Sequence, residues 1–215
     1  MTKFYLFLSL LFISIAAHAQ KMHQYNLNQM YKAGELVTGS PQNLSLLTDA
    51  GKQGVALKNG VVWLKGFNFS TGTIEVDVKG KDVYQQSFLG IAFHGVDTIT
   101  YDAVYLRPFN FHATDSLRKN HAVQYVSYPD YPWEKLRAEH PLMYEKAVPP
   151  SLSANEWVHV KIVVQDEWIS VYLNNVSTPS LKIKKLNDRT GGLIGLWAVG
   201  NEAAEFANLV ITTGN

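Results

Sequence analysis

The chain of 215 residues contains no cysteine. Disulfide bonds, thiol nucleophiles and cysteine-ligated zinc are therefore excluded. It also lacks an excess of charge of either sign, because 19 Lys and Arg oppose 18 Asp and Glu without a basic block. Proteins that bind nucleic acid need clustered cations to neutralise phosphates, so we expect no nucleic-acid partner. Gly-x-Ser-x-Gly, phosphate-loop and dinucleotide-binding patterns are also absent.

Long apolar runs are missing except at the start of the chain. Phe4–Ala16 follows the positive charge of Lys3 and is too short to cross a bilayer comfortably. Ala17-His18-Ala19 then supplies a small-x-small cleavage pattern. We expect residues 1–19 to be a cleaved signal peptide and Gln20 to begin a periplasmic or secreted bacterial protein without a membrane contact. An uncleaved anchor is the alternative.

The remaining chain predicts one all-β domain. Residues 20–34 are polar, and we expect a flexible N-terminal segment there, followed by a domain over residues 35–215. About a dozen short alternating runs follow, punctuated by Gly, Asn, Asp and Pro, which is typical of a two-sheet antiparallel sandwich. Asn59-Gly60 predicts a two-residue hairpin turn between Val55–Lys58 and Val61–Leu64.

The alternation also predicts which side chains are buried, because successive residues of a strand face opposite sides. We expect the core to include one apolar face from each of several strands. Its predicted members are Val76, Ile91, Val104, Leu106, Val160, Ile162 and Val171.

Three consecutive strands, Ser87–His94, Thr100–Phe111 and His121–Tyr128, carry a second face of a different kind. That face mixes small residues with aromatic and polar ones. Small residues leave room above a sheet, and polar aromatic groups can hold a flat, hydroxylated ligand. The sequence therefore predicts a working face, whose members are Gly90, Ala92, His94, Ala103, Tyr105, Arg107, Gln124 and Tyr128.

One long insertion follows the last of these strands. Pro129–Glu156 contains four further prolines and a short helical pattern from Trp133 to His140. Pro132 stands where a helix prefers to begin. Long ordered insertions are usually functional, so we expect a lid or rim wall beside the working face. A surface decoration at the edge of the sandwich is the alternative.

Three segments resemble a known group of proteins: Gly72–Lys79, Gly192–Trp197 and Phe206–Ile211. They are similar to laminin-G-like domains and to the 3-keto-disaccharide hydrolase-like domains of exported bacterial proteins, within the concanavalin A-like lectin and glucanase superfamily. The resemblance covers Leu36 to Thr212. It implies a jelly roll of two antiparallel sheets with one short helical insertion, and a saccharide or polysaccharide bound across a concave sheet. Fold alone does not decide between binding and catalysis.

The glycosidases of this superfamily carry Glu-x-Asp-x-Glu or Glu-x-Asp-x-x-Glu on one strand, with the outer carboxylates as nucleophile and acid. The nearest match here is Glu75-Val-Asp77-Val-Lys79, where lysine replaces the second glutamate. Retaining hydrolysis needs both carboxylates. We therefore reject that mechanism at this position and expect a solvated strand face with cross-strand ion pairs.

Arg107 is the leading candidate for a site. Its guanidinium could clamp a carboxylate or vicinal hydroxyls, and a structural salt bridge or a stack on a tyrosine is the alternative. His94 could act as a base near neutral pH, or be a hydrogen-bonded structural residue. Together with Tyr105, these two residues are the catalytic candidates.

Further binding candidates surround Arg107. Gln124 and Tyr128 offer an amide and a phenol to sugar hydroxyls. Trp133 could lay its ring against a pyranose, or anchor the insertion to the sandwich. Trp197 suits a core as well as a site.

Metal and cofactor binding is not expected. His112, Asp115 and His121 lie around a polar loop, but without the tight spacing of a transition-metal site. We expect no cofactor. The resemblance leaves open a structural calcium ion held by loop oxygens.

Three classes of function remain open. A saccharide-binding protein without turnover is favoured by the missing carboxylate pair. A glycoside hydrolase or polysaccharide lyase, using His94, Tyr105 or Tyr128 with Arg107, is favoured by the lid-like insertion. A protein-binding laminin-G-like module ranks last, because the small residues of the working face favour a groove over a flat patch.

Overall fold

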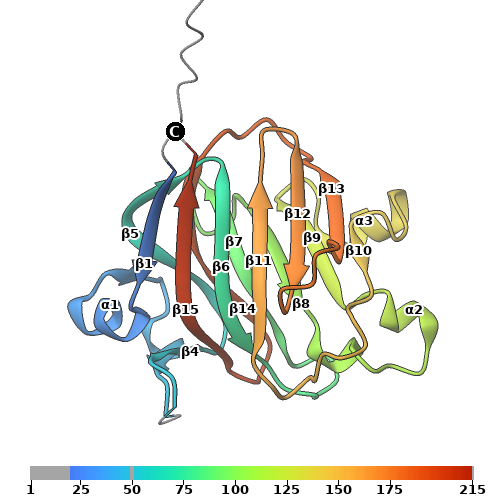
Figure 1. The fold of residues 1–215 in the computed structure, drawn as a ribbon, viewed down its shortest axis with the longest axis horizontal. Coiled ribbons are helices and arrows are strands. Elements are labelled where there is room, and N and C mark those ends of the chain that lie inside the picture. The colour runs from blue at the N-terminus through green and yellow to red at the C-terminus, as the bar shows by residue number, and fades with distance from the viewer. Residues whose placement is uncertain (1–19, 49–50, 215) are drawn as a thin grey trace, which may run out of the picture.

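The structure is a computed structural model that describes residues 20–48 and 51–214 (Figure 1). The predicted signal peptide lies outside the described residues. Two antiparallel sheets, of eight and seven strands, pack face to face with the apolar core between them. This arrangement confirms the predicted all-β jelly-roll sandwich.

The eight-stranded sheet, called sheet A below, lies in front in Figure 1. It places the N-terminal strand beside the C-terminal one, since β1 (Lys21–Tyr25) pairs with β15 (Ala204–Thr213). In spatial order the other strands are β13 (Leu181–Lys184), β12 (Trp168–Leu173), β11 (Val158–Val164), β6 (Gly72–Lys79), then β15, β4 (Gly54–Leu57) and β3 (Leu44–Leu46).

The seven-stranded sheet, sheet B, contains the three strands of the predicted working face as direct neighbours. Its spatial order is β10 (Glu145–Lys146), β9 (Val123–Tyr128), β8 (Tyr101–Leu106), β7 (Phe88–Gly95), β14 (Gly192–Val199), β5 (Gly60–Phe69) and β2 (Leu36–Val37).

Short helices stand at two sides of the sandwich. Helices α2 (Ser116–Lys119) and α3 (Trp133–Glu139) lie beside β10, and α1 (Leu27–Ala33) lies at the opposite side (Figure 1). Helix α3 confirms the predicted helix and ends one residue earlier than expected. Two 3₁₀ turns complete the elements: η1 (Pro41–Asn43) and η2 (Pro108–Asn110). Among the described residues, no helix is long and apolar enough to cross a membrane.

The core is the one that strand alternation predicts. All seven residues expected in it are at most 3% exposed, from Ile162 and Val171 at 0% to Val160 at 3%. Leu89, Ile91 and Leu106 of sheet B are buried in the same cluster. Burial alternates along β11 and separates its two faces as predicted, whereas β7 and β8 are buried on both faces.

The prediction of a flexible segment over residues 20–34 is wrong. Strand β1 pairs with β15 from Lys21 opposite Thr213 to Tyr25 opposite Leu209. Helix α1 follows, capped by the side chain of Asn26, and buries Leu27. Strand β15 lies at the other end of the chain, so the local sequence around residues 21–25 does not predict that β1 pairs with it.

The predicted hairpin at Asn59-Gly60 is also wrong. Strand β4 belongs to sheet A and pairs with β15, whereas β5 belongs to sheet B and pairs with β14. Gly60 adopts the positive φ of 106° that the turn signal implied. The turn is real, but it carries the chain from one sheet to the other because long-range pairing decides the partners of both strands.

Candidate functional site

The face of sheet B turned away from sheet A, called the outer face below, contains the predicted working face. Tyr105 lies opposite Gly90 on β7 and opposite Gln124 on β9. Trp197 extends this row beyond Gly90, and Glu145 extends it beyond Gln124. The row therefore crosses five strands from β14 to β10.

Aromatic rings fill the middle of the outer face. The rings of Tyr105 and Trp197 lie 4.7 Å apart, and Trp197 Nε1 donates to the Tyr101 hydroxyl at 3.1 Å. A Cβ on Gly95 would lie 2.5 Å from the Trp63 ring, so a glycine at this position leaves room for the indole. The small residues thus make room for the protein's own rings, and the open space lies elsewhere.

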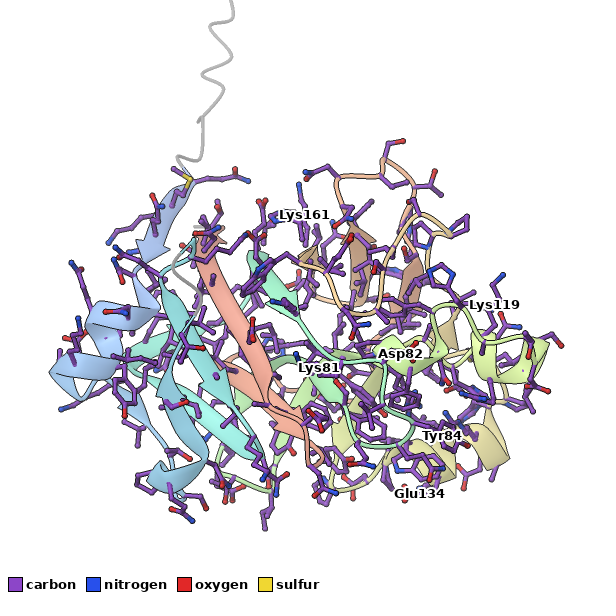
Figure 2. All side chains as sticks on the ribbon, turned by 90° about the horizontal axis from the view of Figure 1, so that it is seen from below. Lys81, Asp82, Tyr84, Lys119, Glu134 and Lys161 are labelled. Atoms are coloured by element: carbon purple, nitrogen blue, oxygen red, sulfur yellow. The ribbon has the colours of Figure 1, made fainter. Side chains whose placement is uncertain are left out.

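That space is a cavity of about 360 Å³ beside the β10 end of the outer face. Small-molecule pockets span roughly 300–1,000 Å³, so its size suits a small ligand. Its aromatic lining is Tyr84, Phe88, Phe109 and Trp133. Its polar lining is Gln85, Arg107, Asn110, Arg118, His121 and Arg137. The 81–87 loop and α3 both line this cavity, through Tyr84 and Trp133. Figure 2 labels Tyr84 and Glu134, the residue after Trp133.

Arg107 lies on the outer face, as predicted, but protein groups occupy its guanidinium. One terminal nitrogen donates to the Tyr105 hydroxyl at 2.5 Å and also to Gln124 Oε1. The other donates to the backbone oxygen of His121 at 3.0 Å. The residue is only 4% exposed. Arg107 therefore lines the cavity, while buried protein groups bind its guanidinium. This agrees with the alternative of a structural arginine stacked on a tyrosine, since the guanidinium lies 4.7 Å from the centre of the Tyr105 ring.

Glu145 is the carboxylate that contacts Arg107 and Arg137. Arg137 contacts both of its oxygens, at 2.9 and 3.1 Å from Nε and 2.9 Å from a terminal nitrogen. His121 Nδ1 lies 2.7 Å from Oε1, and Arg107 lies 3.7 Å from Oε2. Sequence reasoning missed Glu145 because a two-residue strand brings it to the site.

Two arginines lie over aromatic rings of the cavity. The Arg118 guanidinium stands 4.3 Å from the centre of the Tyr84 ring, and that of Arg137 stands 4.7 Å from the Trp133 ring. Such cation–π pairs hold both partners in place. Sequence reasoning missed both arginines, although the four-residue spacing of Trp133 and Arg137 on a predicted helix indicates a shared face.

Burial decides the protonation states around the cavity. Loss of hydration raises the pKa of Tyr105 well above its usual value, so the phenol stays protonated and donates to Gln124 Oε1 at 2.8 Å. Burial also lowers the pKa of His121, and the opposing charge of Glu145 does not restore it. His121 is therefore neutral at pH 7.

The predicted position of His94 beside Arg107 is wrong. His94 has a φ of 49°, which ends the alternation of β7 and turns the side chain into the interior. There Nε2 lies 2.6 Å from the backbone oxygen of Ser70, and Nδ1 lies 3.3 Å from Asp102. His94 is 1% exposed and has no access to the cavity.

The other predicted residues fall into two groups. Trp133 lines the cavity, and the insertion that carries it stands beside the outer face. Gln124 is fully buried beneath Arg107. Tyr128 is half-buried and packs 5.3 Å from the Tyr101 ring, away from the cavity lining. The structure thus brings together Arg107 and Trp133 at the cavity, with Tyr105 and Gln124 behind them.

The strand Glu75–Lys79 is an ion-paired surface, as predicted. His159 bridges Asp77 at 2.9 Å and Glu75 at 3.2 Å, and this cluster lies on sheet A rather than sheet B. Lys79 pairs with Glu205 at 3.3 Å. Both carboxylates are therefore paired with neighbouring side chains, and Asp77 also forms an ion pair with Lys52 at 2.6 Å.

The loop residues considered as metal ligands have other partners. Asp115 caps α2, accepting a hydrogen bond from the Arg118 backbone at 2.7 Å, and His121 contacts Glu145. Within residues 20–48 and 51–214, no group of three or more His, Asp or Glu side chains is arranged to hold a metal ion.

Comparison with known proteins shows the fold. No protein-family model and no curated protein matches the sequence. A putative glycosyl hydrolase from Parabacteroides distasonis is 15% identical, with a TM-score of 0.58 over 89% of this chain and 98% of that one. The carbohydrate-binding module CBM66 from Bacillus subtilis is 16% identical, with a TM-score of 0.53 over 79% and 92%.

A β-glucanase from Bacillus licheniformis is also similar, at 16% identity and a TM-score of 0.50 over 81% of this chain and 83% of the enzyme. The fold is therefore the two-sheet antiparallel sandwich that these structures share. Identities this low carry no residue-by-residue equivalence, so the chemistry must be argued from the cavity itself.

Proposed function

We propose that this protein binds a saccharide in the cavity between Tyr84 and Trp133. The observation that carries the proposal is the lining, which combines exposed aromatic rings with forked hydrogen-bond donors. Aromatic rings pack against the apolar faces of sugars, while guanidinium and amide groups bind their hydroxyls. Similar structures include a carbohydrate-binding module and glycosidase-like proteins, which supports a general carbohydrate-related role.

A buried acceptor supports the same conclusion. Asn110 lines the cavity and is 4% exposed, and its Oδ1 has no hydrogen-bond partner among the described residues. A buried acceptor without a donor costs about 1–3 kcal/mol. A sugar hydroxyl in the cavity would donate to it and recover that free energy.

The proposed site differs in extent from a groove across the whole sheet. Since rings fill the middle of the outer face, the ligand is bound at one end, against α3 and the 81–87 loop. A chain end or a short stretch of a polysaccharide fits such a site. Together with the predicted signal peptide, this gives a periplasmic or secreted saccharide-binding protein.

A matched pair of tryptophan variants tests the proposal. Trp133 and Trp168 are similarly exposed, at 37% and 42%, and each lies beside a cation, but only Trp133 lines the cavity. Retention on a panel of immobilised plant, algal and bacterial polysaccharides should fall by ~10-fold or more for Trp133→Ala, as expected when a stacked ring is lost. Trp168→Ala should bind like the parent. Equal losses in both variants, or no retention by the parent, would contradict the proposal.

A second candidate function is turnover of the saccharide. It is favoured by His121, which lines the cavity as a neutral imidazole whose Nδ1 lies 2.7 Å from Glu145 Oε1. A neutral imidazole beside a carboxylate is suited to abstract a proton. Two-carboxylate glycoside hydrolysis is less favoured, because none of the described residues that line the cavity is acidic.

Product analysis separates binding from turnover. Incubation with the retained polysaccharide should release no new reducing ends and no unsaturated sugars if the protein only binds. If products form, His121→Gln should abolish them while the melting temperature and retention persist. Products that survive this substitution would show that His121 is not the base.

A further inference from the structure

We propose that the saccharide bound in this cavity is anionic, carrying a carboxylate or a sulfate ester that Arg118 and Arg137 bind. This inference rests on the proposed saccharide binding and adds the charge of the ligand. Both groups present the same chemistry, a cluster of anionic oxygens that accepts forked hydrogen bonds.

The first argument is the charge balance of the cavity. Three arginines line it, and its described lining contains no acidic residue. Glu145 stands behind the lining and is the one carboxylate in contact with Arg107 and Arg137 among the ion pairs of the described chain. Two of the three arginines therefore share one carboxylate in these ion pairs, and a partly enclosed surface of one sign attracts a ligand of the other.

The second argument is the state of Arg118. No carboxylate lies within ion-pair distance of its guanidinium in the part of the chain that the structure describes. One terminal nitrogen donates weakly to the backbone oxygen of Phe109, at 3.3 Å. Its Nε is buried and has no hydrogen-bond partner among the described residues. A cationic donor in this state gains more from an anionic acceptor than from a neutral hydroxyl.

The third argument is the direction of Arg137. Glu145 holds it through Nε and one terminal nitrogen, and 28% of the side chain is exposed. The ion pair with Glu145 holds the guanidinium beside the Trp133 ring. The second terminal nitrogen of Arg137 takes no part in that ion pair. Arg118 beside Tyr84 and Arg137 beside Trp133 thus give two pairs, each with a ring for the sugar and a cation for its acidic group.

Affinity electrophoresis of the chain from Gln20 to Asn215 tests this inference with two matched pairs of polymers. Polygalacturonate and its methyl ester differ in a carboxylate, and dextran sulfate and dextran differ in a sulfate. We expect at least one charged polymer to be bound ~10-fold more tightly than its neutral partner, and more weakly as salt rises. Arg118→Gln should remove most of that preference, and Arg118→Lys should retain part of it because the charge persists without the fork.

Lys119→Gln is the matched control. Lys119 is exposed and lies on the same short helix as Arg118, but it does not line the cavity. Its replacement by Gln removes the same positive charge as Arg118→Gln. It should leave the preference unchanged. Equal binding of charged and neutral polymers, or equal losses in the Arg118 and Lys119 variants, overturns the inference while saccharide binding stands. Binding of none of the four polymers, and of none in the polysaccharide panel, overturns the proposed function itself.

Discussion

The guanidinium of Arg107 donates a hydrogen bond to the phenol oxygen of Tyr105, two residues earlier in the chain, at 2.5 Å. The Tyr105 hydroxyl donates a hydrogen bond to Gln124 Oε1, which also accepts one from Arg107. The three side chains form a closed, buried network behind the cavity. Removing one member leaves polar groups of the others without partners, and such groups are costly in a low-dielectric interior.

The first prediction concerns this network. From the sequence alone, a free fork at Arg107 predicts that Arg107→Lys weakens ligand binding with little change in stability. The buried network reverses that expectation. We expect Arg107→Lys to lower the free energy of unfolding by about 1–3 kcal/mol, because lysine cannot reach both Tyr105 and the His121 backbone oxygen.

Urea denaturation measures this change, and Arg118→Lys is its control. Arg118 is a cavity arginine without a carboxylate partner among the described residues, so its substitution should shift stability by no more than ~0.5 kcal/mol. A loss for Arg118→Lys as large as that for Arg107→Lys would show that the buried network does not stabilise the fold.

The second prediction concerns the core. Ile162 is fully buried between the sheets, and Lys161 beside it faces the other way on β11. Ile162→Ala should cost about 2–4 kcal/mol through lost burial and a residual cavity. Lys161→Ala should change stability by less than about 0.5 kcal/mol. Thermal and urea denaturation of the two variants compare adjacent positions, and equal effects would contradict the assignment of faces.

The third prediction concerns acid stability. Burial acts to raise the pKa of Asp102, but the hydrogen bond from His94 and the charge of Arg189 outweigh it, so the pKa is lowered below 3.8. The folded state therefore binds fewer protons than the unfolded state below about pH 5. The stability that Asp102 contributes is present above the unfolded pKa and is lost as the pH falls through the folded pKa.

Denaturation near pH 7, pH 5 and pH 3 checks this sign. Asp102→Asn should lose less stability between pH 5 and pH 3 than the parent does. Asp77→Asn is a second variant, at the surface of sheet A. Burial acts to raise the pKa of Asp77, but hydrogen bonds from Lys52 and His159 outweigh it and lower the pKa. An unchanged slope in both variants would contradict the assigned pKa shifts.

The fourth prediction concerns the start of the mature chain. Cleavage after Ala19 leaves β1 complete, since its pairing with β15 begins at Lys21 opposite Thr213. We expect intact-mass analysis of the exported protein to give a chain beginning at Gln20. A chain that retains residues 1–19 would contradict the predicted signal peptide. A chain that begins beyond Tyr25 would instead show that β1 is dispensable.

The sequence by itself determined the sandwich, its core and helix α3. Alternation with a period of two identifies buried faces because a strand offers one side chain in two to the core. It placed Ile91, Leu106 and Ile162 inside, and it placed Arg107 on the opposite face. The helical pattern from Trp133 likewise predicted an element that the structure contains.

Only the tertiary structure decided what the site is made of. A positive φ at His94 turned a predicted catalytic residue into the interior. The cavity joins side chains from the 81–87 loop, β7, η2, α2 and α3. Glu145 stands behind this lining and comes from a strand of two residues. Local patterns do not specify such contacts, because residues distant in the sequence meet only when the sheets and their connections have packed. Arg107 itself became a buried network residue, since its partners arrive from β9 and the segment before it.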